Sequence, residues 1–171
     1  MILRHTNLSR VLALALLAGG AAACSSTRER EELQFTDQPV ERLYNRGGEM
    51  LDRHRWPDAL AAFEEVERQH PYSSWARRSM LMEAFAHYQA NQYDDAIEDA
   101  QRFIALHPGN ESAPYAYYLV AMCHFERILD VGRDQGTTER AMASLNDVVR
   151  RFPESPYARD ARLKLDMVHD Q

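Results

Sequence analysis

The chain has 171 residues, of which 45% are apolar and 27% are charged, with 7 glycines, 7 prolines and 2 cysteines. This composition excludes a disordered chain, a collagen-like repeat and a disulfide-rich scaffold, and the length suffices for one or two domains with a buried core. The formal net charge is −6 and Lys164 is the only lysine, so the basic cluster that a nucleic-acid partner requires is missing from the sequence.

Residues 1–23 have the pattern of a secretory signal peptide. Two arginines precede an apolar run over residues 11–18, which is too short to span a bilayer, and small residues follow it. Cys24 comes directly after them, as in the lipobox of bacterial lipoproteins, although Ala21 stands where that motif usually has leucine. We predict that Cys24 is acylated and begins a linker over residues 24–37. An ordinary cleavage site beside an unmodified cysteine is the alternative.

Residues 38–171 repeat with a period of 37 residues. Gly47, Ala84 and Ala121 follow one another at this interval, and the pairs Ala59–Ala96 and Pro71–Pro108 share it. The pattern resembles the tetratricopeptide repeat, in which two antiparallel helices pack closely where each offers a small side chain, and a proline ends the second helix. We therefore predict an all-α, tetratricopeptide-like solenoid of three helix pairs and the first helix of a fourth. The repeats are expected at about 38–72, 73–110 and 111–154, with a partial repeat at 155–171.

The helices of these repeats follow from apolar residues that recur every three or four positions. They are expected over residues 38–53, 57–69, 74–90, 93–106, 113–131, 138–151 and 156–170. The third repeat is eight residues longer than the others, and two glycines within residues 130–137 predict a loop there, in which Arg133 and Asp134 are candidate contacts for a partner. Ala161 and Leu165 of the last helix would have no partner helix, which predicts a truncated sequence.

The patterns typical of metal sites and of catalysis are missing from the sequence. His70 and His107 are one repeat apart, as are His87 and His124, which indicates shared packing geometry instead of metal ligation. The sequence contains no zinc-protease spacing, no nucleophile elbow and no phosphate-binding glycine loop. Cys123 lies in an apolar helical stretch and is expected to be a buried, inert thiol. We predict a binding module without metal, cofactor or catalytic residues.

The first helices of the repeats carry an unusual number of aromatic residues. In tetratricopeptide arrays these helices line a concave groove, and counting from the small residue of each helix places mostly aromatic or large apolar side chains on that face. Such a groove suits an extended peptide with aromatic side chains. Burial of several of these side chains between the helices is the alternative. The candidate peptide-groove residues are Arg78, Leu81, Phe85, Tyr88, Tyr115, Tyr118 and Met122.

Two segments extend the resemblance beyond the repeat itself: residues 70–76 (His-Pro-Tyr-Ser-Ser-Trp-Ala) and residues 152–158 (Phe-Pro-Glu-Ser-Pro-Tyr-Ala). With the lipobox-like start, the linker and the insertion at residues 130–135, they resemble the BamD family, the lipoprotein subunits of the outer-membrane β-barrel assembly machinery. The resemblance covers about residues 24–171, the first three of the family's five repeats.

The resemblance implies a scaffold with no enzymatic step, anchored by lipid to the periplasmic face of the outer membrane. It also implies that the amino-terminal repeats receive unfolded outer-membrane β-barrel proteins through the C-terminal signal of those proteins. From its place in the predicted groove, we expect Arg78 to pair with the terminal carboxylate of that signal. BamA and other assembly subunits are the further partners that the resemblance implies, with BamA contacted by later repeats.

Two other functions remain open at this point. A periplasmic repeat protein of the Tol–Pal and cell-division system shares the Phe-Pro repeat junctions, but it lacks the acylated cysteine and usually has an amino-terminal coiled coil. An enzyme that uses the solenoid as a scaffold would need a catalytic domain beyond residue 171.

Overall fold

The computed structural model describes residues 38–131 and 135–169, and within them it contains seven α-helices and no strand. The all-α prediction is confirmed. Cys24, the expected signal peptide and linker, and Arg133 and Asp134 lie outside the described residues. The helices are α2 (Val40–Asp52), α3 (Trp56–Gln69), α4 (Ser74–Gln89), α5 (Tyr93–Leu106), α6 (Ala113–Val131), α7 (Gln135–Arg151) and α8 (Pro156–His169).

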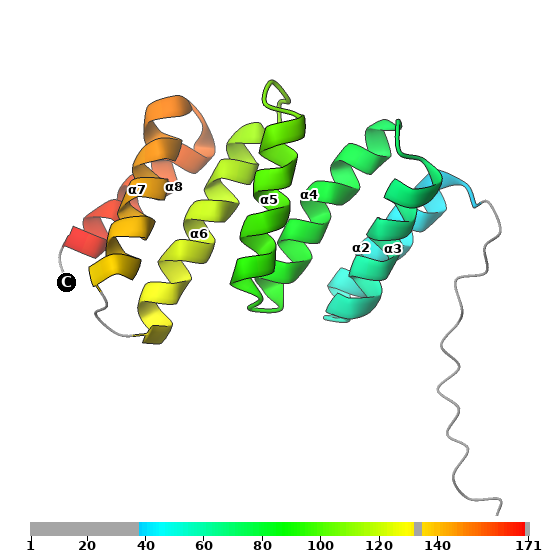
Figure 1. The fold of residues 1–171 in the computed structure, drawn as a ribbon, viewed down its shortest axis with the longest axis horizontal. Helices are drawn as coiled ribbons and strands as arrows, with labels where there is room; N and C mark the ends of the chain where they lie inside the picture. The colour runs from blue at the N-terminus through cyan, green and yellow to red at the C-terminus, as the bar shows by residue number, and fades with distance from the viewer. Residues whose placement is uncertain (1–37, 132–134, 170–171) are drawn as a thin grey trace, which may run out of the picture. The chain divides into compact units, whose positions relative to one another are not determined.

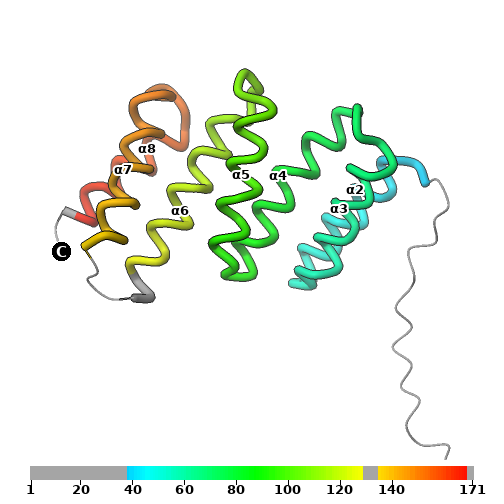
Figure 2. Tube along the Cα trace, viewed as in Figure 1, coloured from blue at the N-terminus to red at the C-terminus, as the bar shows by residue number. Residues whose placement is uncertain are grey.

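The helices of the 37–171 unit follow one another in space in chain order (Figures 1 and 2). Each helix packs against the next one along the chain, and α2, α4, α6 and α8 also contact each other in succession. The backbones of α3, α5 and α7 do not approach one another in this way within the described residues. The first helices of the pairs therefore form one continuous layer and the second helices form the other.

Local sequence fixes where these helices begin and turn. The Oγ atom of Ser73 accepts a hydrogen bond from the backbone N–H of Ala76 at 3.0 Å, and Ser155 caps α8 in the same way through Ala158 at 3.1 Å. The turn inside each of the first two pairs contains a residue with positive φ, His54 at 57° and Asn91 at 59°. These two residues are 37 positions apart, so the repeat extends to the backbone conformation of its turns.

The small residues of the repeat lie where the helices cross. Gly47 is buried, and a methyl group there would come within 3.0 Å of three ring carbons of Phe63. The corresponding alanines are fully buried: Ala59, Ala84, Ala96, Ala121 and Ala141. The small residues that recur with the 37-residue period therefore lie where two helices approach closely, as the sequence predicts.

The third repeat differs from the prediction at its insertion. Helix α6 ends at Val131, as predicted, but α7 begins at Gln135, three residues before the predicted start, so the loop expected over residues 130–137 is shorter than predicted. Both helices are longer than their counterparts: α6 has 19 residues and α4 has 16, while α7 has 17 and α5 has 14. Thr137 is buried in the first turn of α7, and this burial favours the earlier start of the helix.

The exposed apolar face of α8 also differs from the prediction. Ala161 and Leu165 are buried against α6 and α7, with exposed fractions of 0% and 9%. Leu163 and Met167 are the exposed apolar side chains of this helix. The face assignment from sequence was wrong by about half a turn, because α8 packs on both helices of the preceding pair.

Candidate functional site

A cavity of about 330 Å³ opens on the layer of first helices, between the amino-terminal ends of α4 and α6. We call it the α4–α6 cleft. Its walls come from α2, α4, the end of α5, the α5–α6 loop and the start of α6. The lining residues are Tyr44, Ser74, Arg77, Arg78, Leu81, Met82, Phe103, Asn110, Glu111, Ser112 and Tyr115.

The cationic wall of the cleft is held by aromatic rings. The guanidinium carbon of Arg78 lies 5.2 Å from the centre of the Trp75 ring, and that ring lies 4.9 Å from the ring of Tyr44. Burial raises the pKa of the Tyr44 hydroxyl, and the positive charge of Arg78 opposes this shift. With Arg77 also on this wall and Glu111 as the only acid in the lining, the cleft favours an anionic group.

The opposite wall is aromatic and nearly buried. Burial raises the pKa of Tyr115 to about 12, with a smaller contribution from Tyr157, whose ring centre is 5.4 Å away. Leu81 is 8% exposed and lies with Phe103 at the cleft's floor. Of the seven residues predicted for a groove, this cleft brings together Arg78, Leu81 and Tyr115.

Two of the other predicted groove residues connect successive first helices. The hydroxyl of Tyr88 on α4 donates a hydrogen bond to Glu126 on α6 at 3.4 Å, and the hydroxyl of Tyr118 on α6 donates to Asp160 on α8 at 2.5 Å. Burial, together with these carboxylates, raises the pKa of both hydroxyls. These tyrosines are half-buried structural links outside the cleft lining.

Phe85 and Met122 also lie outside the cleft lining. Phe85 packs against the buried residues of α2 to α4, and Met122, at 7% exposed, belongs to the core formed by α6, α7 and α8. For these two side chains the structure supports the alternative of burial between the helices.

The cleft also contains residues that the sequence analysis did not single out, notably Arg77, Asn110 and Ser112. The side chain of Asn110 accepts a hydrogen bond from the backbone N–H of Ser112 at 2.9 Å, which shapes the loop before α6. Position counting within helices cannot find loop residues. The Pro-Gly-Asn sequence at 108–110 is typical of a turn, and it is the feature of the sequence that could have indicated this loop.

The described residues contain no cluster of three or more histidine, cysteine, aspartate or glutamate side chains that could hold a metal. Burial raises the pKa of the Cys123 thiol to about 12, so the thiol is protonated at neutral pH. None of the helices in the described part of the chain has the length and apolar character needed to span a membrane.

Comparison with known proteins places this geometry in a family. A family model described as "YfiO: Outer membrane lipoprotein" matches residues 36–171. The outer membrane protein assembly factor BamD of Caulobacter vibrioides is 55% identical over 160 residues, which cover 94% of this chain and 52% of that protein. BamD of Rickettsia prowazekii is 36% identical over 163 residues, which cover 95% of this chain and 62% of the relative. The chain thus spans only part of the length of these relatives.

Solved structures of low sequence identity share the fold. The first tetratricopeptide domain of Spaghetti, solved with an HSP90 peptide, aligns with a TM-score of 0.57 at 17% identity, over 79% of this chain and 94% of that one. The Arabidopsis OM64 tetratricopeptide domain aligns with a TM-score of 0.56 at 14% identity, over 75% and 94% of the two chains. Both support a tetratricopeptide fold for the helix pairs.

Proposed function

The chain belongs to the YfiO family of outer membrane lipoproteins, and from this premise we propose that it is a non-catalytic scaffold in outer-membrane protein assembly. Its role is to receive unfolded outer-membrane β-barrel proteins at the periplasmic face of the membrane. BamA and other subunits of the β-barrel assembly machinery are the proposed partners. The names of the two BamD relatives support this assignment over the Tol–Pal alternative, which they do not favour.

Membrane attachment is proposed to run through an acylated Cys24. Acyl chains contribute about 0.8 kcal/mol per buried methylene, so two or three chains dominate attachment. The variant Cys24→Ala is expected to lose the acyl mass and to move from the outer-membrane fraction to the periplasmic fraction when the other assembly subunits are absent. The matched control is Cys123→Ala, which removes the buried thiol and keeps the acyl group. An unmodified wild-type mass would contradict the anchor.

The observation that carries the binding proposal is the position of Arg78 beside Arg77, between Tyr44 and Tyr115. A peptide that ends in an aromatic residue would place its ring between the tyrosines and its carboxylate against the arginines. Ordering an extended peptide offsets much of the gain from burying its apolar surface, so a dissociation constant in the micromolar range is expected.

The test is a titration of a ten-residue peptide that ends in phenylalanine, prepared once with a free carboxylate and once with a terminal amide. We expect the carboxylate peptide to bind at least about tenfold more tightly to the wild-type protein, because a charge-assisted hydrogen bond is worth roughly 1.5–3 kcal/mol and each 1.4 kcal/mol is about tenfold in affinity. In Arg78→Ala this preference should disappear. Circular dichroism shows whether each variant remains folded.

The control variant is Arg159→Ala, which removes an exposed arginine on α8, away from the cleft lining. It changes the net charge as Arg78→Ala does and should keep the full preference for the carboxylate. The proposal would be wrong if both peptides bound the wild type equally well. It would also be wrong if Arg78→Ala and Arg159→Ala lost the preference for the carboxylate peptide to the same extent.

A further inference from the structure

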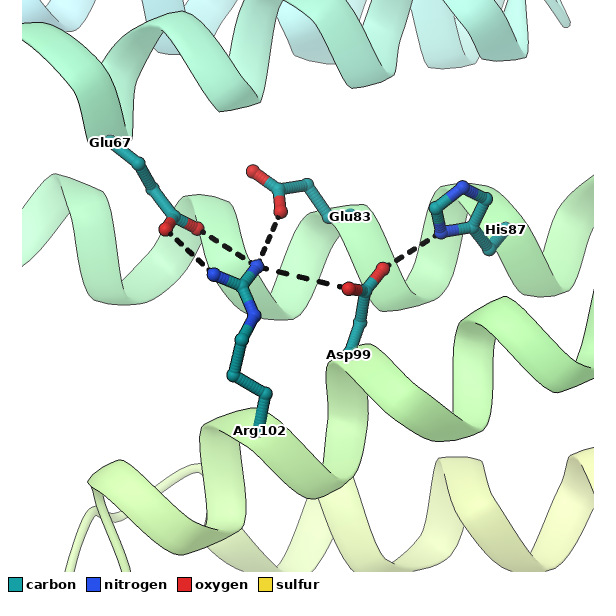
Figure 3. Close-up of polar contacts among 5 residues, drawn as sticks. All are labelled: Glu67, Glu83, His87, Asp99 and Arg102. Carbon is teal, nitrogen blue, oxygen red and sulfur yellow. Dashed lines mark hydrogen bonds and ion pairs between the residues drawn. The ribbon is translucent and has the colours of Figure 1, made fainter.

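A polar network joins the first helix pair to the second, on the side of α4 that packs against α3 and α5 (Figure 3). Arg102 on α5 donates hydrogen bonds to Glu67 on α3 at 3.0 Å and to Glu83 on α4 at 2.8 Å. It also lies 3.8 Å from Asp99, whose other oxygen is 2.7 Å from Nδ1 of His87 on α4. One guanidinium therefore faces three carboxyl groups from three helices.

Glu83 occupies the most enclosed position in this network. Its side chain is 6% exposed, and its Oε1 atom is buried without a hydrogen-bond donor among the described residues. Figure 3 shows one carboxyl oxygen of Glu83 turned toward Arg102 and the other turned away from it. A fully ionised carboxylate with an unsatisfied buried oxygen is costly, whereas a protonated carboxyl removes that charge.

The next junction along the chain shows that this network is not required by the repeat. One repeat further, Ile104 and Val120 replace Glu67 and Glu83, and His124 replaces His87. With the insertion counted, Ser144 and Asp147 replace Asp99 and Arg102. These five residues line a cavity of about 320 Å³ between α5, α6 and α7, and the ion pairs of Asp147 there are with Arg150 and Arg151 of its own helix. The buried carboxyl is therefore specific to the α3–α4–α5 junction.

We propose that the α3–α4–α5 junction is a pH-sensitive contact, which is tight while the Glu83 carboxyl carries a proton and loosens when that proton is lost. The groups that face Glu83 determine this behaviour. Glu67 from α3 and Asp99 from α5 are negative and oppose its ionisation, whereas Arg102 from α5 favours it. His87, on α4 itself, contacts the junction through Asp99.

The direction of the effect follows from the pKa of Glu83. Burial, reinforced by Glu67 and Asp99 and opposed by Arg102, raises this pKa from 4.5 to about 9. The folded chain therefore binds the proton more tightly than the unfolded chain does. The stabilisation is fully present below about pH 4.5 and is lost progressively as the pH rises toward about 9.

Hydrogen exchange of the backbone amides of α4 at pH 6, 7 and 8 tests this proposal. Protection factors, which already account for the intrinsic exchange rate, should fall by up to about tenfold per pH unit for amides that exchange when the junction opens. Amides that exchange through fraying of α8 should keep constant protection, because this motion leaves Glu83 buried. In Glu83→Gln, which keeps the shape and cannot ionise, the pH dependence in α4 should disappear.

Two further variants test whether the pH dependence comes from Glu83 or from a neighbouring side chain. Glu98→Gln changes an exposed carboxylate of α5 and should keep the wild-type pH dependence. His87→Gln removes the imidazole that contacts Asp99 at the junction and should also keep it. Loss of the dependence in His87→Gln together with its persistence in Glu83→Gln would overturn the proposal and assign the effect to the histidine.

A direct titration keeps the proposal falsifiable if Glu83→Gln does not fold. The ¹³C resonance of the Glu83 side-chain carboxyl in the wild-type chain should change between pH 7 and pH 10 and stay constant between pH 3 and pH 6. A midpoint between pH 3 and pH 6 would mean that Glu83 is already ionised at neutral pH, and the proposal would be wrong.

Discussion

Replacing Phe63 by alanine is expected to lower the free energy of unfolding by about 3–5 kcal/mol, which is typical of a buried phenylalanine. Phe63 is 0% exposed, and it packs between α2, α3 and α4 with Met50, Leu51 and Ala86. Its ring also meets the ring of Tyr44, with 5.5 Å between the centres. Urea denaturation followed by circular dichroism measures the loss.

A double-mutant cycle with Gly47 tests the reason for this loss. In the wild-type background, Gly47→Ala should destabilise the protein, because the new methyl group would lie within 3.0 Å of three Phe63 ring carbons. In the Phe63→Ala background the same change should stabilise the protein by up to about 1 kcal/mol, since alanine is the better helix former. Gly48→Ala, with nothing within 4 Å, should stabilise both backgrounds. An effect of Gly47→Ala that is equal in both would disprove the contact.

The second large effect is expected where two helices cross within the second pair. Ala84 and Ala96 are both 0% exposed, and Ala84 packs with Ala100 and Leu119. Ala84→Leu and Ala96→Leu should each lower the free energy of unfolding by roughly 1–3 kcal/mol, because the larger side chain overpacks the crossing.

The matched control for these substitutions is Glu98→Leu, on the exposed face of the same α5 helix that carries Ala96. It adds a leucine without entering the crossing and should change the stability by no more than about 0.5 kcal/mol. Equal effects at the three positions would mean that the 37-residue register does not mark helix crossings.

The sequence was sufficient to predict the fold because one interaction repeats through it. Gly47, Ala84 and Ala121 mark the first helices, and prolines mark the ends of the second ones, so the helix positions follow from counting. The start of α7 was the main exception. Two glycines in a polar stretch favour a loop locally, yet the burial of Thr137 favours another helical turn.

The residues that line the cleft were harder to predict, because groove residues and core residues occur on the same faces of the first helices. Counting placed Arg78, Leu81 and Tyr115 on the inner side, where the cleft contains them. Counting could not distinguish these cleft residues from Tyr88 and Tyr118. The hydroxyls of those two tyrosines bind acidic side chains about 40 residues further along the chain. Such pairings depend on how successive first helices are offset, which no local pattern reveals.

The Glu83 network could not be predicted from the sequence either, because it too depends on how the helices pack. A glutamate in a helix usually faces solvent, and this one is enclosed because both α3 and α5 pack against α4. Comparison of the repeats gives one indication that Glu83 is buried: the equivalent position one repeat later is Val120. An apolar residue at the equivalent position indicates that the site is buried.

The most direct test of the central claim, that the α4–α6 cleft binds the carboxylate end of a client peptide, is hydrogen exchange of the protein with and without the peptide that ends in phenylalanine. We expect added protection at residues 74–82 and 110–116, which form the two walls, and none around Ser144 and Asp147, which line the cavity between α5, α6 and α7. Protection confined to α5 and α7, with no change at residues 74–82, would contradict the account.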